Sequence, residues 1–313
     1  MNGGTFGGVA SKNKVVLTNG GQLVITGGTF NFDPSAYVAV GYVASKVGSN
    51  WEVVAASNGT KYEIDGVEYT YASDAAGFTA ALKETDAVVL ADGAYTMPAI
   101  SGKEVTIKGS ENTVITVNKP NMSGSDVTFD GVTVKGSGYA TGVQHVNTVT
   151  YKNATIVGEM CLYGEKNTFE NCTFELAKGK YIWSYGSKES EFIGCTFNTA
   201  GKALLVYNEG AGANKVTVKN CTFNATAGDK AGAIANQNCA AVEIDNFQSN
   251  GVGAAHVVVT ENNTYSENFS GEWRIKNYVA GNAITVNGTE YTQIAVDGKL
   301  MTIDASKNVT VLE

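Results

Sequence analysis

The chain has 313 residues, and 30 acidic against 22 basic side chains give it a formal net charge of −8. This balance excludes the basic surface that nucleic-acid binding requires, and no apolar run is long enough to span a membrane as a helix. Apolar residues make up 43% of the chain and aromatic residues 10%. This composition excludes a disordered protein.

Residues 1–57 are predicted to be the tail of a preceding β repeat module. They contain Gly-Gly-Thr-Phe twice, and then a phrase that begins at Asp33-Pro-Ser-Ala-Tyr37. This phrase resembles the closing motif of repeat modules in large surface proteins of gut Bacteroidetes. The resemblance implies an extracellular or cell-surface location in a larger multi-module chain. The absence of a signal-peptide pattern after Met1 leads us to expect an excised fragment.

Residues 58–85 are predicted to form a β-hairpin followed by a capping helix. Asp65-Gly66 is a dipeptide that two-residue hairpin turns prefer. The segment after it reads as a short helix, with Ser73 as the expected N-cap and Phe78 and Leu82 on one face.

A short phrase that contains Asn or Gly, often followed by Cys-Thr-Phe, recurs from residue 129 onward. Its Asn or Gly falls at positions 131, 153, 171, 194, 220 and 246, so the steps are 22, 18, 23, 26 and 26 residues. A fixed phrase with variable spacing predicts a solenoid in which the bends keep their shape while the loops vary in length. Stacked parallel coils also leave few exposed strand edges.

This pattern resembles the right-handed parallel β-helix proteins of the pectate-lyase-like superfamily, whose tight turn carries an asparagine ladder. The predicted fold class is therefore all-β: a right-handed parallel β-helix over residues 86–278, with a short N-terminal capping helix and flanking β-hairpins. The C-terminal hairpins are expected over residues 279–313, where Asn287-Gly288 and Asp297-Gly298 predict turns.

Two sets of residues in the phrase are predicted to stack along the solenoid. Asparagine tolerates the left-handed backbone of a bend, and buried cysteines that all point the same way are expected to remain free thiols. The predicted structural ladder consists of Asn153, Asn171, Asn220 and Asn246, with Cys172, Cys195 and Cys221 beside them.

The superfamily that this pattern resembles includes pectate lyases and polygalacturonases. Such lyases need carboxylates that hold calcium and an Arg or Lys base. The only arginine, Arg274, lies in a Trp-Arg-Ile-Lys segment that resembles a polygalacturonase motif, but the accompanying acidic motifs are absent. We interpret Arg274 as structural, in a salt bridge or a cation–π contact with Trp273. His145 and His256 are isolated, so the sequence predicts no catalytic residue, no metal site, no cofactor and no enzyme.

A second strand after each Cys-Thr-Phe arm carries aromatic residues. Strand alternation places Leu162, Ile182, Leu204 and Val206 in the interior and the intervening side chains outside. An aromatic surface with polar neighbours suits sugar rings, although aromatic side chains also simply cover a sheet. The candidate binding residues on this outer face are Tyr163, Tyr181, Trp183, Tyr185, Tyr207 and Asn236.

Three functions remain open from the sequence. The leading hypothesis is a non-catalytic surface or secreted module that is adhesive or glycan-binding, with a polysaccharide or surface glycan as its partner. The first alternative is a polysaccharide lyase or glycoside hydrolase with an atypical site. The second is a structural spacer or a component of a phage tail or filament, and the sequence does not define the oligomeric state.

Overall fold

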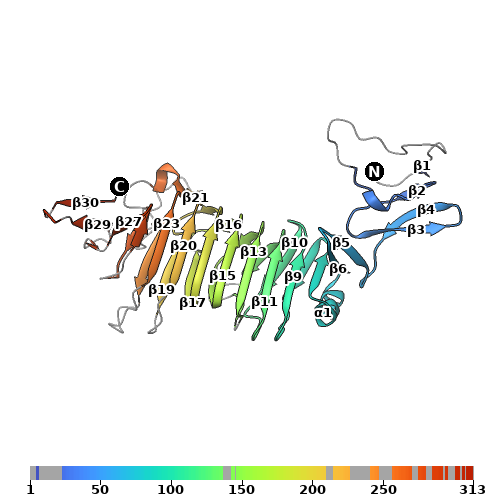
Figure 1. The fold of residues 1–313 in the computed structure, drawn as a ribbon, viewed down its shortest axis with the longest axis horizontal. Coiled ribbons are helices and arrows are strands. Elements are labelled where there is room, and N and C mark those ends of the chain that lie inside the picture. The colour runs from blue at the N-terminus through green and yellow to red at the C-terminus, as the bar shows by residue number, and fades with distance from the viewer. Residues whose placement is uncertain are drawn as a thin grey trace. The chain divides into compact units, whose positions relative to one another are not determined.

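The computed structural model is almost entirely β and divides into two compact units, residues 1–93 and 94–313 (Figure 1). None of its described helices is long and apolar enough to cross a membrane. The structure describes residues 5–6, 23–136, 142–144, 146–208, 214–225, 240–246, 256–269, 274–279, 284–291, 293–294, 300–303, 305–306 and 308–312.

The first unit opens with a four-stranded sheet in the order β1-β2-β4-β3. Its small core contains Ile25, Phe30, Phe32 and Val53. The role of this segment as the tail of a repeat module stays a prediction. Its elements are β1 (Thr5–Phe6), β2 (Gly28–Phe30), the 3-10 helix η1 (Ser35–Tyr37), β3 (Tyr42–Val47) and β4 (Asn50–Ala55).

A hairpin and the capping helix follow in the same unit. The hairpin joins β5 (Lys61–Ile64) to β6 (Val67–Ala72), and Asp65 and Gly66 take φ angles of +51° and +79°, as a two-residue turn of this kind requires. Helix α1 (Ala75–Glu84) contacts β6 and β7 (Ala87–Leu90).

The N-cap of α1 is Asp74 rather than the predicted Ser73. The Asp74 carboxylate accepts a hydrogen bond from the backbone N–H of Gly77 at 2.7 Å. The backbone N–H of Ser73 instead donates to the Asn58 side chain, also at 2.7 Å.

The second unit is the solenoid, and it confirms the predicted fold class: a right-handed parallel β-helix of about 8 turns with flanking hairpins. Its first sheet has the order β27-β26-β23-β20-β17-β15-β13-β11-β9, parallel except for the β26–β27 hairpin. Its strands are β9 (Glu104–Lys108), β11 (Asp126–Asp130), β13 (Thr148–Lys152), β15 (Met160–Glu170), β17 (Ile182–Ile193), β20 (Lys215–Lys219), β23 (Val257–Glu261), β26 (Ile284–Val286) and β27 (Thr289–Tyr291).

The second sheet of the solenoid has the order β24-β21-β18-β16-β14-β12-β10-β8. A branch of the first sheet runs from β17 through β19 and β22 to β25, while a three-stranded antiparallel sheet, β28-β29-β30, lies near the C-terminus of the sequence. The remaining elements are β8 (Gly93–Thr96), β10 (Thr113–Val117), β12 (Thr133–Gly136), β14 (Thr155–Val157), β16 (Thr173–Leu176), β18 (Thr196–Thr199), β19 (Leu204–Asn208), β21 (Thr222–Ala225), β22 (Val242–Asn246), β24 (Thr264–Tyr265), the 3-10 helix η4 (Glu267–Phe269), β25 (Ile275–Asn277), β28 (Gln293–Ile294), β29 (Leu300–Ile303) and β30 (Val309–Val311).

The bends between the two sheets use the left-handed backbone that the repeated phrase predicts. Asn153, Asn171 and Asn220 have φ angles of +49°, +53° and +55°, and Gly194 has +64°. The Oδ1 atom of Asn171 lies 2.6 Å from the place where a Cβ on Gly194 would be, so a larger residue at position 194 would displace the Asn171 amide.

Asn246 is not in this file of bend residues, and its predicted place in the ladder is wrong. It ends β22, which pairs with β19, whereas β20 pairs with β23. The bend one coil after Asn220 is therefore Asn262, with a φ of +53°, and the N–H of Asn220 donates to the carbonyl of Glu261. The insertion between β21 and β23 carries an Asp-Asn pair that resembles the phrase without occupying its position.

The core of the solenoid contains two columns of stacked aromatic rings. Neighbouring rings lie 4.3 to 5.3 Å apart between centroids and within 13° of parallel. Because each ring belongs to a different coil, the columns hold consecutive coils in register. One column consists of Phe129, Tyr151, Phe169 and Phe192, and the other of Phe174, Phe197, Phe223 and Tyr265.

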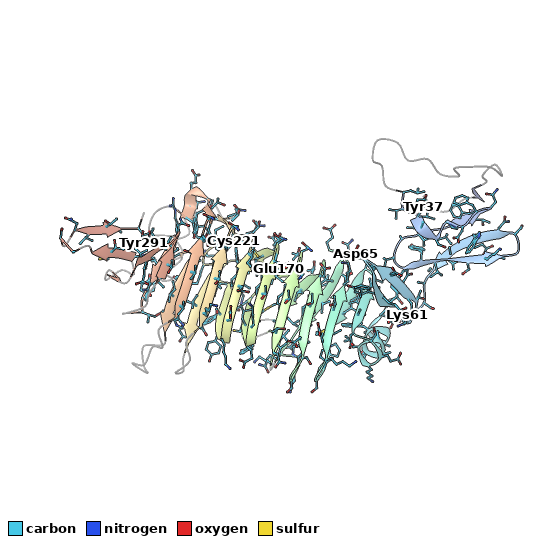
Figure 2. The ribbon with its side chains drawn as sticks, in the orientation of Figure 1. Tyr37, Lys61, Asp65, Glu170, Cys221 and Tyr291 are labelled. Carbon is cyan, nitrogen blue, oxygen red and sulfur yellow. The ribbon has the colours of Figure 1, made fainter. Side chains whose placement is uncertain are left out.

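The three cysteines of the phrase point into the same core. Cys172, Cys195 and Cys221 are each about 1% exposed and are free thiols (Cys221 is labelled in Figure 2). A hydrogen bond with Cys172 is the main cause that raises the pKa of Cys195 to about 12. These thiols act as small buried side chains of the core.

Candidate functional site

Five aromatic side chains, here called the aromatic row, form a continuous set on the outer face of β15, β17 and β19 and at Tyr181, directly before β17. The centroids of Tyr181 and Trp183 are 4.9 Å apart, those of Trp183 and Tyr207 are 5.7 Å apart, and those of Tyr207 and Tyr185 are 6.1 Å apart. Tyr163 meets Tyr185 edge-on at 6.3 Å. All five side chains are half-buried, so each presents part of its ring to solvent.

Strand register explains why these rings meet. β15, β17 and β19 are parallel neighbours, with Leu162 opposite Ser184 and Ser184 opposite Val206. The residues that the sequence places in the interior are buried, at 0 to 1% exposure, so the intervening side chains face outward: Leu162, Ile182, Leu204 and Val206.

The predicted sixth member of this set, Asn236, lies outside the described residues. The register places Asp245 of β22 opposite Tyr207. On the neighbouring strand, the position next to Tyr207 is therefore acidic rather than aromatic.

Glu159 fixes the indole of Trp183, a contact that the sequence did not indicate. The Nε1–H of Trp183 donates to one carboxylate oxygen of Glu159 at 3.0 Å, and the Nζ of Lys180 donates to the other at 3.0 Å. Glu159 is only 6% exposed, so this carboxylate is a rigid anchor under the aromatic row.

A second, more deeply buried ion pair joins Lys202 to Glu243. The exposed fractions of the two side chains are 14% and 2%, and the Nζ of Lys202 also lies 4.8 Å from the ring centroid of Tyr181. On the outer face of β17, β19, β22 and β25, four residues lie opposite one another on successive strands: Trp183, Leu205, Glu243 and Lys276.

The carboxyl group of Glu243 is held far from its ordinary protonation behaviour. Burial raises its pKa to about 7, although the charge of Lys202 acts in the opposite direction. Its Oε1 atom is buried and has no hydrogen-bond partner among the described residues. A carboxyl group with such a pKa exchanges a proton near neutral pH.

A groove of about 650 Å³ adjoins the Tyr163 end of the aromatic row. Beside it, the β15–β17 register shifts between Leu162 and Gly164, and Gly164 takes a φ of +94°. A Cβ on Gly164 would lie 2.5 Å from the carbonyl oxygen of Val146, so the position requires glycine. The groove is lined by Ser123, Gly124, Gln144, Val146, Asn147, Tyr163, Gly164, Glu165 and Lys188.

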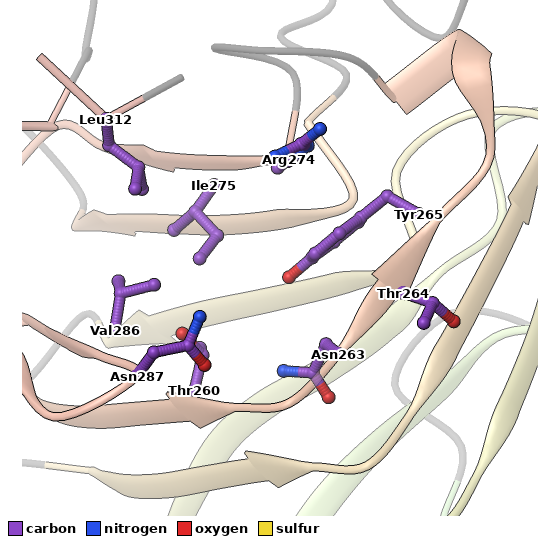
Figure 3. A pocket seen from close by; sticks show the side chains of 9 residues that line it. All are labelled: Thr260, Asn263, Thr264, Tyr265, Arg274, Ile275, Val286, Asn287 and Leu312. Carbon is purple, nitrogen blue, oxygen red and sulfur yellow. The ribbon is translucent and has the colours of Figure 1, made fainter.

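A second cavity, of about 390 Å³, lies among β23, β24, β25 and β26 (Figure 3). Arg274 belongs to this cavity, with its guanidinium 5.7 Å from the ring centroid of Tyr265. Arg274 makes a cation–π contact with Tyr265, while the predicted contact with Trp273 lies outside the described residues.

The remaining candidates take no part in the aromatic row. His256 is 1% exposed, burial lowers its pKa to about 4, and its Nδ1 accepts a hydrogen bond from the N–H of Asn214 at 3.3 Å. It is a neutral core histidine, and His145 lies outside the described residues. Within the described ranges, no three His, Cys, Asp or Glu side chains gather as a metal site would need.

Comparison with known proteins gives matches to solved structures. No family model matches the sequence, and no curated protein matches it. The fold is similar to the PL6 family alginate lyase AlyGC, at 12% identity and a TM-score of 0.44, over 69% of this chain and 38% of that one. A variant of that lyase gives 12% identity and a TM-score of 0.42, over 74% and 47%. The chain thus spans less than half the length of either structure, and the likeness concerns the fold alone.

These matches correct the prediction that the chain is not an enzyme. Both structures are of a PL6 family alginate lyase, AlyGC and its variant. The Bacteroidetes resemblance, the extracellular or cell-surface location and the multi-module parent chain stay predictions.

Proposed function

We propose that the chain binds a polysaccharide along the aromatic row and the adjoining groove. The observation that carries the proposal is the unbroken series of ring contacts from Tyr181 to Tyr163, which ends at the mouth of the groove. An extended series of partly exposed rings offers repeated apolar platforms to the flat faces of successive sugars.

The polar groups beside the rings suit the hydroxyl groups of the same ligand. The groove adds the amides of Gln144 and Asn147 and the charged pair Glu165 and Lys188, whose Oε2 and Nζ atoms are 2.5 Å apart. A few fixed polar groups around an apolar surface are typical of sites that orient a ligand. The row covers three neighbouring strands, a width of roughly 10 Å at the usual strand spacing.

The buried carboxyl group of Glu243 favours a second candidate function, the cleavage of the bound polysaccharide. A group with a pKa of about 7 gives and takes protons at neutral pH more readily than an ordinary carboxyl group. Lys202 pairs with it and also contacts Tyr181, so Lys202 connects Glu243 to the aromatic row. A sugar bound there would reach the carboxyl group once the Lys202 side chain moves aside.

Polysaccharide binding is tested by affinity electrophoresis or calorimetry against a panel of neutral and acidic polysaccharides. We expect Trp183→Ala and Tyr185→Ala each to weaken binding by about ten-fold or more, because each removes one platform. Tyr291→Ala, at a half-buried tyrosine outside the row, is the matched control. Equal binding by all three variants and the unaltered chain would reject the proposal.

Cleavage is tested on the polysaccharides that bind, by measuring unsaturated products and new reducing ends over roughly pH 5 to 9. We expect Glu243→Gln to stop product formation while polysaccharide binding remains. Products formed at an unchanged rate by Glu243→Gln would remove Glu243 from the reaction, and no products from any bound polysaccharide would reject the second candidate alone.

A further inference from the structure

Two ion pairs lie beside the rings of the aromatic row. The Nζ of Lys180 and the Oε2 of Glu159 are 3.0 Å apart, and in the groove the Nζ of Lys188 and the Oε2 of Glu165 are 2.5 Å apart. The side chain of Glu159 is 6% exposed, whereas those of Lys188 and Glu165 are 75% and 57% exposed. One pair is therefore anchored in the protein and the other is open to solvent, and in both a carboxylate already neutralises the lysine.

The strands next to the row carry balanced charge as well. Lys202 pairs with Glu243, and strand register places Lys276 opposite Glu243 and Asp245 opposite Tyr207. With Glu243 ionised, these side chains provide two positive and two negative charges, while the whole chain has a net charge of −8. A polyanion therefore meets no surplus of lysines among these described residues, and the net charge of the chain repels it.

A neutral sugar and a uronate differ in how they can contact such ion pairs. A hydroxyl group both donates and accepts hydrogen bonds, so a sugar can donate to Glu165 and accept from Lys188 without breaking their pair. The carboxylate of a uronate only accepts. To reach Lys188 it must displace Glu165 or lie beside it, where the two negative charges repel each other.

We propose that the ligand of the aromatic row and the groove is a neutral polysaccharide, and that the ion pairs exclude polyuronates. The inference rests on the proposed function and names the class of polysaccharide. The rings stack on the apolar faces of neutral sugars, while the Lys188–Glu165 pair and the amides of Gln144 and Asn147 bind their hydroxyl groups. Repulsion of the wrong ligand is a source of specificity, and here the carboxylates supply it.

The proposal is tested by calorimetry of the full chain with three pairs of polysaccharides, each with a neutral and an acidic member. The pairs are hydroxyethyl cellulose and carboxymethyl cellulose, galactan and polygalacturonate, and mannan and polymannuronate. We expect a neutral member to bind about ten-fold more tightly than its acidic counterpart at low salt. High salt should narrow this difference, because it screens the repulsion.

Removal of one carboxylate should relax the exclusion. Glu165→Gln takes away the partner of Lys188 and should raise the ratio of acidic to neutral affinity by about five-fold at low salt. The Glu165 side chain is exposed, so the variant should keep the fold. Glu261→Gln, which breaks the 2.7 Å pair with Lys219 elsewhere on the solenoid, is the matched control and should leave that ratio unchanged.

Three outcomes would count against the proposal, and they are distinguishable. Tighter binding of an acidic member, if Trp183→Ala weakens it, would overturn the neutral ligand and leave the proposed function standing. An affinity ratio that Glu165→Gln does not raise would overturn the exclusion by the ion pair. No binding of any polysaccharide, or binding that Trp183→Ala and Tyr185→Ala leave unchanged, would reject the proposed function and this inference with it.

Discussion

Two outer regions of the same solenoid carry Lys–Glu ion pairs that differ in their exposure to water. On the C-terminal halves of β15 and β17, and on β20 and β23, lysines and glutamates pair between coils at the surface. Lys166 pairs with Glu191 at 2.6 Å, and Lys219 pairs with Glu261 at 2.7 Å, with side chains 23 to 41% exposed. In the branch beside the aromatic row, the Lys202–Glu243 pair is almost withdrawn from water.

The difference shows that strand register brings charges together, while burial decides what the contact is worth. An exposed pair contributes roughly 0 to 1 kcal/mol, because water and salt screen it. A buried pair is costly to form, and removal of one partner costs roughly 3 to 5 kcal/mol, because a charge is left without compensation. The stacked backbone is the same in both regions, and the second differs in holding a buried carboxyl group of raised pKa next to a lysine that contacts Tyr181.

The largest expected effect comes from the removal of the buried cation. Lys202→Met should lower the free energy of unfolding by about 3 kcal/mol at pH 9, because Glu243 must then either stay charged without its partner or take up a proton two units above its pKa of about 7. Lys219→Met, which breaks the exposed pair with Glu261, is the control and should cost under about 1 kcal/mol. Urea denaturation measures both, and equal losses would contradict the contrast between the two regions.

The pH dependence of stability sharpens the same contrast. The pKa of Glu243 is about 7 in the folded chain and about 4.3 in the unfolded chain, so the folded state holds the extra proton between these values. The stability that this proton contributes is present below about pH 4.3 and is lost as the pH rises to 7, by about 3 kcal/mol. His256 acts in the opposite sense, since its contribution is lost as the pH falls from about 6.5 toward 4.

In the unaltered chain, the pH dependence of stability due to Glu243 opposes that due to His256. A comparison with Glu243→Gln isolates the contribution of Glu243. Between pH 4.5 and 8 the stability of Glu243→Gln should improve relative to the unaltered chain by about 3 kcal/mol, because glutamine mimics the protonated carboxyl group and does not titrate. Urea denaturation at a series of pH values measures this gap. A gap that is constant with pH would show that Glu243 has an ordinary pKa.

A smaller effect is expected at the register shift beside the groove. Gly164→Ala should cost about 2 kcal/mol, because a Cβ would collide with Val146 in a left-handed backbone. Gly179→Ala, with a φ of +73° and open space around its Cα, should cost only about 1 kcal/mol. Thermal denaturation gives both values, and polysaccharide binding should fall only in Gly164→Ala. Identical behaviour of the two variants would show that the register shift at Gly164 has no part in polysaccharide binding at the groove.

The smallest effect is expected on the exposed charges around Glu189. Lys166→Met and Lys215→Met should each cost under about 1 kcal/mol, since both lysines contact the same carboxylate, at 3.6 and 3.1 Å. The losses should shrink in high salt. Urea denaturation at low and high salt measures them, and a loss that is independent of salt would indicate a packing role for the lysine stems.

The fold was predictable because its physical requirements recur in every coil. A buried ring, a left-handed bend and a buried cysteine reappear at matching positions, and the structure stacks Phe169 on Phe192 as the phrase implies. The error at Asn246 arose where a longer insertion separates β21 from β23 and brings in a similar pair of residues. Short motifs could not distinguish Asn246 from Asn262 without the strand pairing.

The aromatic part of the site was predictable from strand alternation, whereas its charged part was not. Tyr185 and Tyr207 end comparable strands, so their shared face follows from the sequence. Glu159 and Lys202 precede β15 and β19 and lie outside the repeated phrase. Glu243 lies in β22, the strand whose Asn246 was wrongly assigned to the bend position. No local pattern links Lys202 to Glu243, and the contact exists only because β19 and β22 pair.

The two ring columns have a consequence for how such a chain can change in length. Each ring packs against a similar ring in the coil before and the coil after it, with nearly the same separation and tilt. A coil inserted whole would therefore meet compatible neighbours on both sides, whereas truncation of a single ring disturbs two junctions at once. Growth by duplication of complete turns is the change that this interior tolerates best, and it would lengthen any ligand track on the outside in the same step.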